Sequence, residues 1–175
     1  MEKDNVVEVS EKVFEMSDKD NDDEASDIQC SYSVVVRTSA KSPCTDFGTV
    51  VIQLIDVDGN ETDKWRLKYS ITHRTKFKAG HSDLFVFANT HELGDLAHVN
   101  VFLMKKKQEE YWALHSINVI KHTYDHNTYD HVLYRFGSHQ NIGEGDEPNK
   151  FINVRLNVEG APYQVLHEQD FLPDL

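Results

Sequence analysis

The sequence predicts an all-β fold, an antiparallel β-sandwich of about eight strands. Two observations support this prediction. Apolar residues occupy alternate positions in many short runs, a pattern that gives a strand one face for a core and one for water. Turn-forming residues separate these runs at intervals of about eight to twelve residues, and no long stretch has the spacing of an amphipathic helix.

The first 29 residues lack this pattern and are predicted to be a disordered acidic tail. They contain 11 acidic and 3 basic side chains, and the run from Asp18 to Glu24 is too charged to bury. The run superficially resembles a calcium-binding EF-hand loop. Its sixth position is Asp23 instead of glycine and its twelfth is Gln29 instead of glutamate, so an EF-hand is excluded.

The alternating pattern begins near Cys30, and each later element has its own signal. Residues 31–38 alternate valine with polar residues, and residues 49–57 follow after a turn-rich connector. Asp58-Gly59-Asn60 then supplies a hairpin turn, because glycine adopts positive φ without a steric penalty. The remaining strands are expected at residues 65–72, 77–79, 83–89, 98–105, 112–121 and 151–158.

We expect one folded domain over residues 30–160 and a C-terminal extension over residues 161–175. The two cysteines, Cys30 and Cys44, lie at the start of the first strand and in the connector after it. The first residues do not resemble a secretory signal, and no run of about 18 apolar residues is present. We therefore expect a cytoplasmic protein with two free thiols.

Charge and motifs narrow the function classes. The net charge of −12 argues against general nucleic-acid binding, because phosphate contacts need clustered basic residues. The sequence also lacks the nucleophile elbow of hydrolases, the phosphate-binding loop of nucleotide hydrolases and the dinucleotide-binding fingerprint. We therefore expect a protein that is not an enzyme.

Four short motifs occur in a fixed order. The first is Tyr-x-Val-x-Val-x-Thr, formed by Tyr32, Val34, Val36 and Thr38, and the second is the Gly-Thr pair of Gly48 and Thr49. The third is Phe-x-x-Gly-x-x-Asp-x-Phe, formed by Phe77, Gly80, Asp83 and Phe85. The fourth is Trp-x-Leu-x-x-Ile-x-Val, formed by Trp112, Leu114, Ile117 and Val119. Together they resemble the PLAT domain (polycystin, lipoxygenase, alpha-toxin), also called the lipoxygenase-homology domain. The resemblance extends from Tyr32 to Phe136.

The resemblance implies a non-catalytic β-sandwich module that attaches to membranes or to protein partners, in some members with the help of Ca²⁺ at loop acids. Two features depart from the family pattern. The acid expected after the Gly-Thr pair is Val50 here, which removes one expected calcium ligand. Residues 121–149 are also unusual. Either Tyr134 and Phe136 belong to the last family strand, or residues 121–149 are an insertion and residues 151–158 close the sheet.

A basic stretch is the first candidate binding surface. Cations alternate with apolar residues here, and in a strand this alternation places them on the outer face. Such a face attracts anionic lipid head groups, which predicts a protein at the cytoplasmic side of a membrane. An ordinary solvated face with lysines guarding an edge strand is the alternative. The residues are Lys64, Arg66, Lys68, Arg74, Lys76 and Lys78, with a second basic run at residues 105–107.

Loop acids are the second candidate site, for Ca²⁺. Calcium needs six or more oxygen ligands, and acids near strand ends are typical sources of them. The candidate ligands are Asp46, Asp56, Asp58, Asn60, Asp83 and Asp95. Two alternatives remain open, because residues 58–60 are equally explained as a turn and Asp83 can hydrogen-bond backbone amides beside Gly80.

A near-repeat, His-Thr-Tyr-Asp-His at residues 122–126 and Asn-Thr-Tyr-Asp-His at residues 127–131, is the third candidate. In a helix, His122 and His126 would share one face and chelate Zn²⁺, with Asp125 and Asp130 as further ligands or as acceptors for the imidazole N–H groups. The glutamate of a His-Glu-x-x-His motif is absent, and the Asn-Thr pair interrupts a helix. We therefore expect a polar loop.

Overall fold

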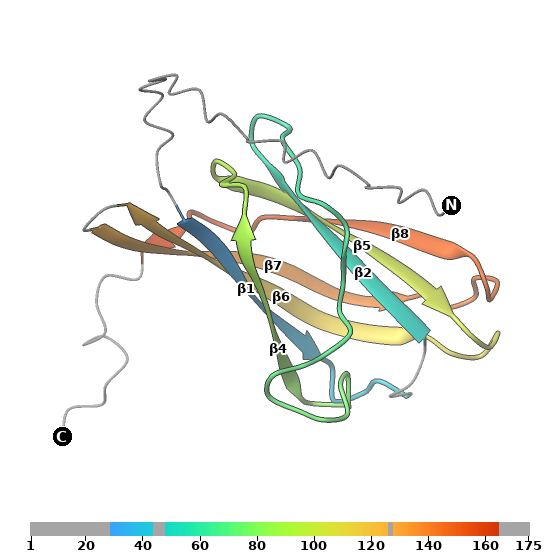
Figure 1. Ribbon diagram of the computed structural model, residues 1–175. Coiled ribbons are helices and arrows are strands. Elements are labelled where there is room, and N and C mark those ends of the chain that lie inside the picture. The colour runs from blue at the N-terminus through green and yellow to red at the C-terminus, as the bar shows by residue number, and fades with distance from the viewer. Residues whose placement is uncertain (1–28, 44–47, 126–127, 165–175) are drawn as a thin grey trace, which may run out of the picture.

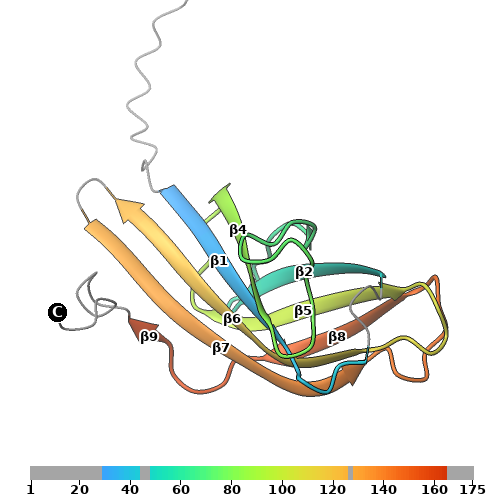
Figure 2. The same ribbon diagram turned by 90° about the horizontal axis from the view of Figure 1, so that it is seen from below.

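The computed structural model describes residues 29–43, 48–125 and 128–164. These residues form nine β-strands and no helix. The strands build two antiparallel sheets that pack face to face (Figures 1 and 2). The predicted all-β sandwich is therefore confirmed. Residues 1–28 of the predicted acidic tail lie outside the described residues, and Gln29 begins the first strand.

Each sheet takes strands from both halves of the chain. The larger sheet has the order β4 (Ser82–Thr90), β1 (Gln29–Thr38), β6 (Trp112–Asp125), β7 (Thr128–Ile142) and β9 (Tyr163–Gln164). The smaller sheet has the order β3 (Trp65–Arg66), β2 (Gly48–Asp56), β5 (Leu96–Lys105) and β8 (Phe151–Asn157). The short strand β9 falls within the segment predicted as a C-terminal extension. In both views the β6–β7 hairpin reaches past the end of the smaller sheet.

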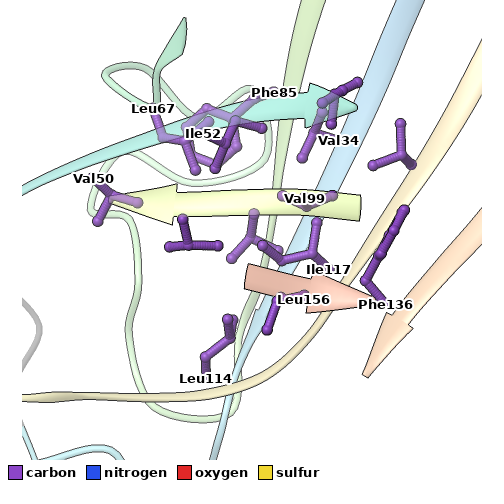
Figure 3. Packing of buried hydrophobic residues seen from close by; sticks show 14 of the residues in the cluster. Val34, Val50, Ile52, Leu67, Phe85, Val99, Leu114, Ile117, Phe136 and Leu156 are labelled. Carbon is purple, nitrogen blue, oxygen red and sulfur yellow. The ribbon is translucent and has the colours of Figure 1, made fainter. Parts of the chain in front are cut away.

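The core lies between the sheets, because each strand turns alternate side chains toward the opposite sheet. Both sheets supply residues to a single apolar cluster, part of which is shown in Figure 3. Full burial of one such side chain contributes roughly 1.5–3 kcal/mol, so the alternation that predicts the strands is also the main source of their stability. Central members are Val34, Ile52, Val99, Ile117, Phe136 and Leu156.

Residues of the four motifs meet at one end of this core. The Trp112 indole N–H donates to the Thr38 hydroxyl oxygen over 3.0 Å, and the Trp112 and Phe77 rings lie 5.1 Å apart. The buried Asp83 carboxylate accepts the Phe77 backbone N–H over 2.8 Å. Gly48 has a φ of +125°, and a Cβ atom there would collide with the Met104 carbonyl oxygen. Packing, hydrogen bonds and steric limits within the fold therefore explain these motif residues without reference to a ligand.

Two predicted strands are wrong. Only Trp65–Arg66 of the expected strand 65–72 pairs with β2, and residues 77–79 form no strand. The chain instead leaves the smaller sheet after β3 and crosses to the larger sheet. Phe77 adopts a left-handed φ of 61°, which is incompatible with an extended strand. This crossing forms a long surface loop over residues 67–81.

Residues 121–149 combine the two alternatives that the sequence left open. Tyr134 and Phe136 lie in β7, and residues 151–157 form β8, so both segments contribute strands to the sandwich. The expectation of a polar loop at the histidine near-repeat is wrong. His122 and His131 lie directly opposite each other on paired strands, while His126 lies outside the described residues.

Two buried lysines hold loops in place. The Lys105 ammonium donates to the carbonyl oxygens of Gln108 (2.8 Å) and Gly143 (2.6 Å). The Lys121 ammonium donates to the Leu93 carbonyl oxygen over 2.9 Å. A buried charge is tolerated only when hydrogen bonds replace its hydration, and these carbonyls provide them. Lys105 is therefore a structural residue and not part of a basic surface.

Candidate functional site

The six predicted basic residues lie on one continuous segment, residues 64–78, which we call the basic loop. It runs from just before β3 to just before β4, the edge strands of the two sheets, and Figure 1 shows it crossing the side of the sandwich. No aspartate or glutamate occurs between residues 64 and 82. The side chains of Lys64, Arg66, Lys68, Arg74 and Lys78 are exposed, and that of Lys76 is half-buried.

Two apolar residues and one lysine fix the shape of the basic loop. Leu67 and Phe77 are buried in the core and anchor the loop near its two ends. The Lys76 ammonium donates to the carbonyl oxygens of Leu67 (2.6 Å) and Lys68 (3.0 Å). These carbonyls are the groups that a continued strand would need for pairing, so Lys76 stabilises the loop in place of a strand.

The middle of the basic loop covers the edge of β4 and exposes apolar side chains. The Ile71 N–H donates to the Leu84 carbonyl oxygen over 2.8 Å, and the Thr72 hydroxyl donates to the Ser82 carbonyl oxygen over 3.1 Å. Despite this attachment, the side chain of Tyr69 is 76% exposed and that of Ile71 is 65% exposed. The loop therefore presents cations and apolar groups together on a fixed backbone.

Histidines lie at the base of the basic loop. The His73 Nδ1 atom is 3.3 Å from a buried Asp83 carboxylate oxygen, and the His73 and His81 rings lie 4.5 Å apart. Asp83 thus accepts hydrogen bonds from the loop on both of its oxygens, including the one from Phe77. This geometry bears out the alternative in which Asp83 binds backbone amides.

Asp56 is a hydrogen-bond acceptor for two loops. Its Oδ1 atom accepts the N–H groups of Asp58 (3.0 Å) and Asn60 (2.8 Å). Its Oδ2 atom accepts the Asn60 side-chain amide (3.0 Å) and the Gly94 N–H (3.0 Å). Burial alone would raise the pKa of Asp56, but these hydrogen bonds outweigh it and hold the pKa below its usual value.

The predicted calcium ligands do not converge on one point. Asp58 and Asn60 are exposed in the turn that Asp56 organises, whereas Asp83 lies at the other end of the sandwich, opposite Val36 near the end of β1. Asp95 accepts the Tyr134 hydroxyl over 2.8 Å. Within the described residues, no group of three or more histidine, cysteine, aspartate or glutamate side chains is placed to hold a metal ion. Asp46 lies outside these residues.

The oxygens of Asp56 and Asp83 therefore do not fit a calcium site in this structure. Calcium needs six or more converging oxygen ligands, and each of these carboxylates instead faces N–H donors. We derive no role for Ca²⁺ from them.

The remaining predicted candidates have defined places. Asp125 is exposed at the end of β6, and Asp130 accepts the Gln164 side-chain amide over 2.8 Å. Cys30 is a free, buried thiol whose pKa is raised chiefly by burial, and Cys44 lies outside the described residues.

Sequence reasoning missed Tyr69 and Ile71 as surface residues. The expected strand 65–72 placed both of them on its inner, apolar face, so both were expected to be buried. The available signal was the density of cations from residue 64 to residue 78 without a single acid, which is unusual for an edge strand in a chain of net negative charge.

Comparisons with known proteins support the fold. No protein-family model matches the sequence, and no curated protein matches it. Solved lipoxygenase structures match instead. A lipoxygenase variant in complex with arachidonate has a TM-score of 0.54 at 18% identity, over 75% of this chain and 17% of that one. A calcium-dependent 11R-lipoxygenase has a TM-score of 0.53 at 19% identity, over 74% and 17% of the two chains.

A third match is a coral 8R-lipoxygenase, described as calcium-activated through a C2-like domain, with a TM-score of 0.50 at 17% identity over 73% of this chain and 17% of that one. The predicted resemblance is thus confirmed for the fold: the chain has a PLAT- or C2-like β-sandwich. The chain spans about a sixth of the length of these lipoxygenases, 17% in each case. None of the described segments forms a helix with the length and hydropathy that a bilayer crossing requires.

Proposed function

We propose that the protein is a non-catalytic binding module that attaches to anionic membrane surfaces through the basic loop, as a peripheral protein of the cytoplasmic side. One observation carries the proposal: a segment with six cations and no acid exposes Tyr69 and Ile71 on the same stretch. Cations bind lipid phosphates and carboxylates, while tyrosine and isoleucine enter the interface between head groups and acyl chains.

The expected affinity is moderate and depends on salt. Each lysine or arginine near an anionic bilayer contributes about 1 kcal/mol, so the five exposed cations supply about 5 kcal/mol at low salt. Transfer of the Ile71 side chain from water into the interface adds up to roughly 1.5–3 kcal/mol. Screening shortens the reach of the cations to about 8 Å at physiological ionic strength, so only a loop that touches the bilayer binds.

The loop is suited to this role because its backbone is already ordered. Lys76 and the buried Leu67 and Phe77 hold it against the sandwich, so little conformational entropy is lost when it docks. The proposed attachment relies on these cations, because the Asp56 and Asp83 carboxylates face N–H donors and the predicted ligands among the described residues do not converge on one point.

Vesicle co-sedimentation tests the proposal. The full chain is mixed with phosphatidylcholine vesicles with or without phosphatidylserine, at low and physiological salt, and with Ca²⁺ or a chelator. We expect binding to the phosphatidylserine vesicles at low salt in both the Ca²⁺ and the chelator samples. Absence of binding at low salt in all samples overturns the membrane function.

A pair of charge-matched variants locates the surface. The loop variant carries Lys64→Glu, Arg66→Glu and Lys68→Glu, whereas the control carries Lys41→Glu, Lys107→Glu and Lys150→Glu at exposed positions elsewhere. Loss of three loop cations costs about 3 kcal/mol, so the loop variant should bind more than a hundredfold more weakly. Equal loss in the control would show that net charge, and not the basic loop, governs attachment.

A protein partner is the second candidate function, and one observation favours it. Across the outer face of the larger sheet, the register places four apolar or aromatic side chains in one row that is interrupted only by Ser33: Val86, Ile120, Leu133 and Tyr163. Val86 is 45% exposed and Tyr163 is 56% exposed. An apolar row of this kind suits a partner protein better than a charged lipid surface. A partner that is retained by the loop variant would support this second function.

A further inference from the structure

The near-repeat of histidines, which the membrane function does not use, forms a close pair on the outer face of the larger sheet. His122 in β6 lies directly opposite His131 in β7, close to the end of the hairpin where Asp125 pairs with Thr128. The two Nδ1 atoms are only 2.7 Å apart, and the rings meet edge to face with centroids 4.9 Å apart. Two ring nitrogens from separate strands therefore face each other across a gap that one proton or one ion can occupy.

The position between these nitrogens holds one proton. An imidazole pair at this distance shares a single hydrogen bond, in which one Nδ1 donates and the other accepts. The other ring nitrogen of His122, Nε2, is 2.8 Å from the Ser33 hydroxyl oxygen on β1. When Nε2–H donates to Ser33, His122 keeps its Nδ1 lone pair free of a proton. Donation of this kind to an oxygen is the usual way in which a metal-binding histidine is oriented.

Neutral imidazole is the form that binds metal ions. A cation at this position displaces the shared proton, which moves to the His131 Nε2 atom, and the hydrogen bond between His122 and Ser33 stays intact.

The geometry favours one class of metal ion. Imidazole nitrogens lie about 2.0–2.1 Å from a bound divalent ion, so two of them at a right angle are about 2.9 Å apart and two at a tetrahedral angle are about 3.3 Å apart. The observed 2.7 Å is closer to the right-angle arrangement. Square-planar and tetragonal sites of this type are typical of Cu²⁺ and Ni²⁺, and Cu²⁺ binds nitrogen ligands most tightly.

The space beside the pair leaves room for further ligands. A surface cavity of about 320 Å³ adjoins the two histidines and is lined also by Ser31, Ala88 and Tyr129. The Tyr129 ring is nearly parallel to that of His131. Cys30 also lines this cavity, but no group of three or more histidine, cysteine, aspartate or glutamate side chains among the described residues is placed to hold an ion, so water or a ligand atom from outside would complete the coordination.

We propose that His122 and His131 form a two-histidine binding site for one Cu²⁺ ion, open on the side of this cavity. Ser33 is a positioning residue, because it holds the His122 ring without touching the ion. The site is independent of the basic loop, which lies on other elements of the fold.

Titration of the full chain with Cu²⁺, followed by calorimetry and electron paramagnetic resonance, tests the site. We expect calorimetry to give one ion per chain, and the electron paramagnetic resonance spectrum to be that of an axial Cu²⁺ ion with two imidazole nitrogen ligands. His122→Asn and His131→Asn should each weaken binding at least tenfold. Ser33→Ala should weaken it less and alter the resonance parameters, which a purely structural role would leave unchanged.

A second histidine pair on the same two strands serves as the control. His115 and His139 also meet edge to face, with centroids 4.5 Å apart, but the His115 Nδ1 atom is within 3.1 Å of the Ser116 hydroxyl. The double variant His115→Asn/His139→Asn should bind Cu²⁺ like the wild type. Unchanged affinity in His122→Asn, or loss of affinity in the control variant, overturns the proposal.

A measurement on the wild type guards against variants that fail to fold. Paramagnetic Cu²⁺ broadens the nuclear magnetic resonance signals of nearby rings, so the signals of His122 and His131 should disappear first at substoichiometric Cu²⁺. Persistence of these signals while other histidines broaden would equally overturn the site.

Discussion

Replacing Asp56 by alanine removes the acceptor that joins two loops at one end of the sandwich. Its two oxygens accept four N–H groups, three from residues 58–60 and one from Gly94, and its side chain is 2% exposed. After the substitution, the donors of the turn can reach water, whereas the Gly94 N–H loses the partner that connects residues 93–95 to β2. We expect both loops to loosen while the core remains intact.

The magnitude follows from the number and type of these bonds. A hydrogen bond to a charged acceptor contributes about 1.5–3 kcal/mol, and the four are not additive because the exposed donors regain water. We therefore expect Asp56→Ala to lower the free energy of unfolding by about 3–5 kcal/mol. Asp56→Asn keeps one carbonyl oxygen and should fall between the wild type and the alanine variant.

Urea denaturation followed by tryptophan fluorescence measures this loss. With a slope of about 1–3 kcal/mol per molar urea, the midpoint should fall by about 2 M. The matched control is Asp58→Ala, an exposed acid of the same turn, which should change stability by less than about 0.5 kcal/mol. A loss below about 1 kcal/mol for Asp56→Ala would refute the reasoning.

The pH dependence supplies an independent check on Asp56. Because its pKa is lower in the folded state than the usual 3.8, its stabilising contribution is complete above that value and is lost as the pH falls through the folded-state pKa. The difference in stability between the wild type and Asp56→Ala should therefore narrow below about pH 4. A constant difference down to pH 2 would show that the ionised carboxylate is not the stabilising species.

Three further predictions concern other parts of the fold. Gly48→Ala should destabilise the domain by at least about 3 kcal/mol in the same assay, because a Cβ atom at this positive φ meets the Met104 carbonyl oxygen; a smaller loss would mean that the strand shifts freely. Lys105→Met should cost about 2–4 kcal/mol, since the buried Gly143 carbonyl and the partly buried Gln108 carbonyl lose their donor, while the exposed control Lys107→Met should be neutral. Burial and neighbouring charges lower the folded-state pKa of His115, so the thermal midpoint should decline as the pH falls below about 6.5, and His115→Asn should flatten this decline; an unaltered slope would contradict this role.

Strands with one face in the core could be predicted from sequence. Residues 31–38, 112–121 and 151–158 carry apolar side chains on alternate positions, and the structure places strands there. Strand β7 was harder to recognise, because polar side chains flank Tyr134 and Phe136 on both sides and the third buried residue, Ile142, lies six residues further along the strand. The β6–β7 pairing extends past the smaller sheet, so alternation is not needed there.

The basic loop could not be distinguished from a strand by its pattern. Lys64, Arg66 and Lys68 alternate with apolar residues just as they would on an edge strand. The difference comes from contacts between distant residues: Lys76 occupies the carbonyls of residues 67 and 68, and Phe77 takes a left-handed conformation under the Asp83 carboxylate. The positions of the cations were predicted correctly even though the element that carries them was not.

In the candidate sites, too, local features could be predicted from the sequence, whereas contacts between distant residues could not. That the Asp58-Gly59-Asn60 segment forms a turn follows from local residue types, but the use of all Asp56 acceptor sites depends on Gly94 from a distant loop. Lysines are mostly exposed, so sequence reasoning counts Lys105 as a surface cation. The pairing of His122 with His131 needed the register of a hairpin whose second strand was not predicted.

The attachment of residues 71 and 72 to β4 has a consequence for the behaviour of the protein in solution. These residues occupy peptide groups of Ser82 and Leu84, at the margin where the larger sheet would otherwise accept another chain. Proteolytic nicking within residues 67–81 would free that margin without disturbing the interior. The nicked protein should then self-associate strand against strand, and its storage life would depend on the integrity of a surface segment far from the core.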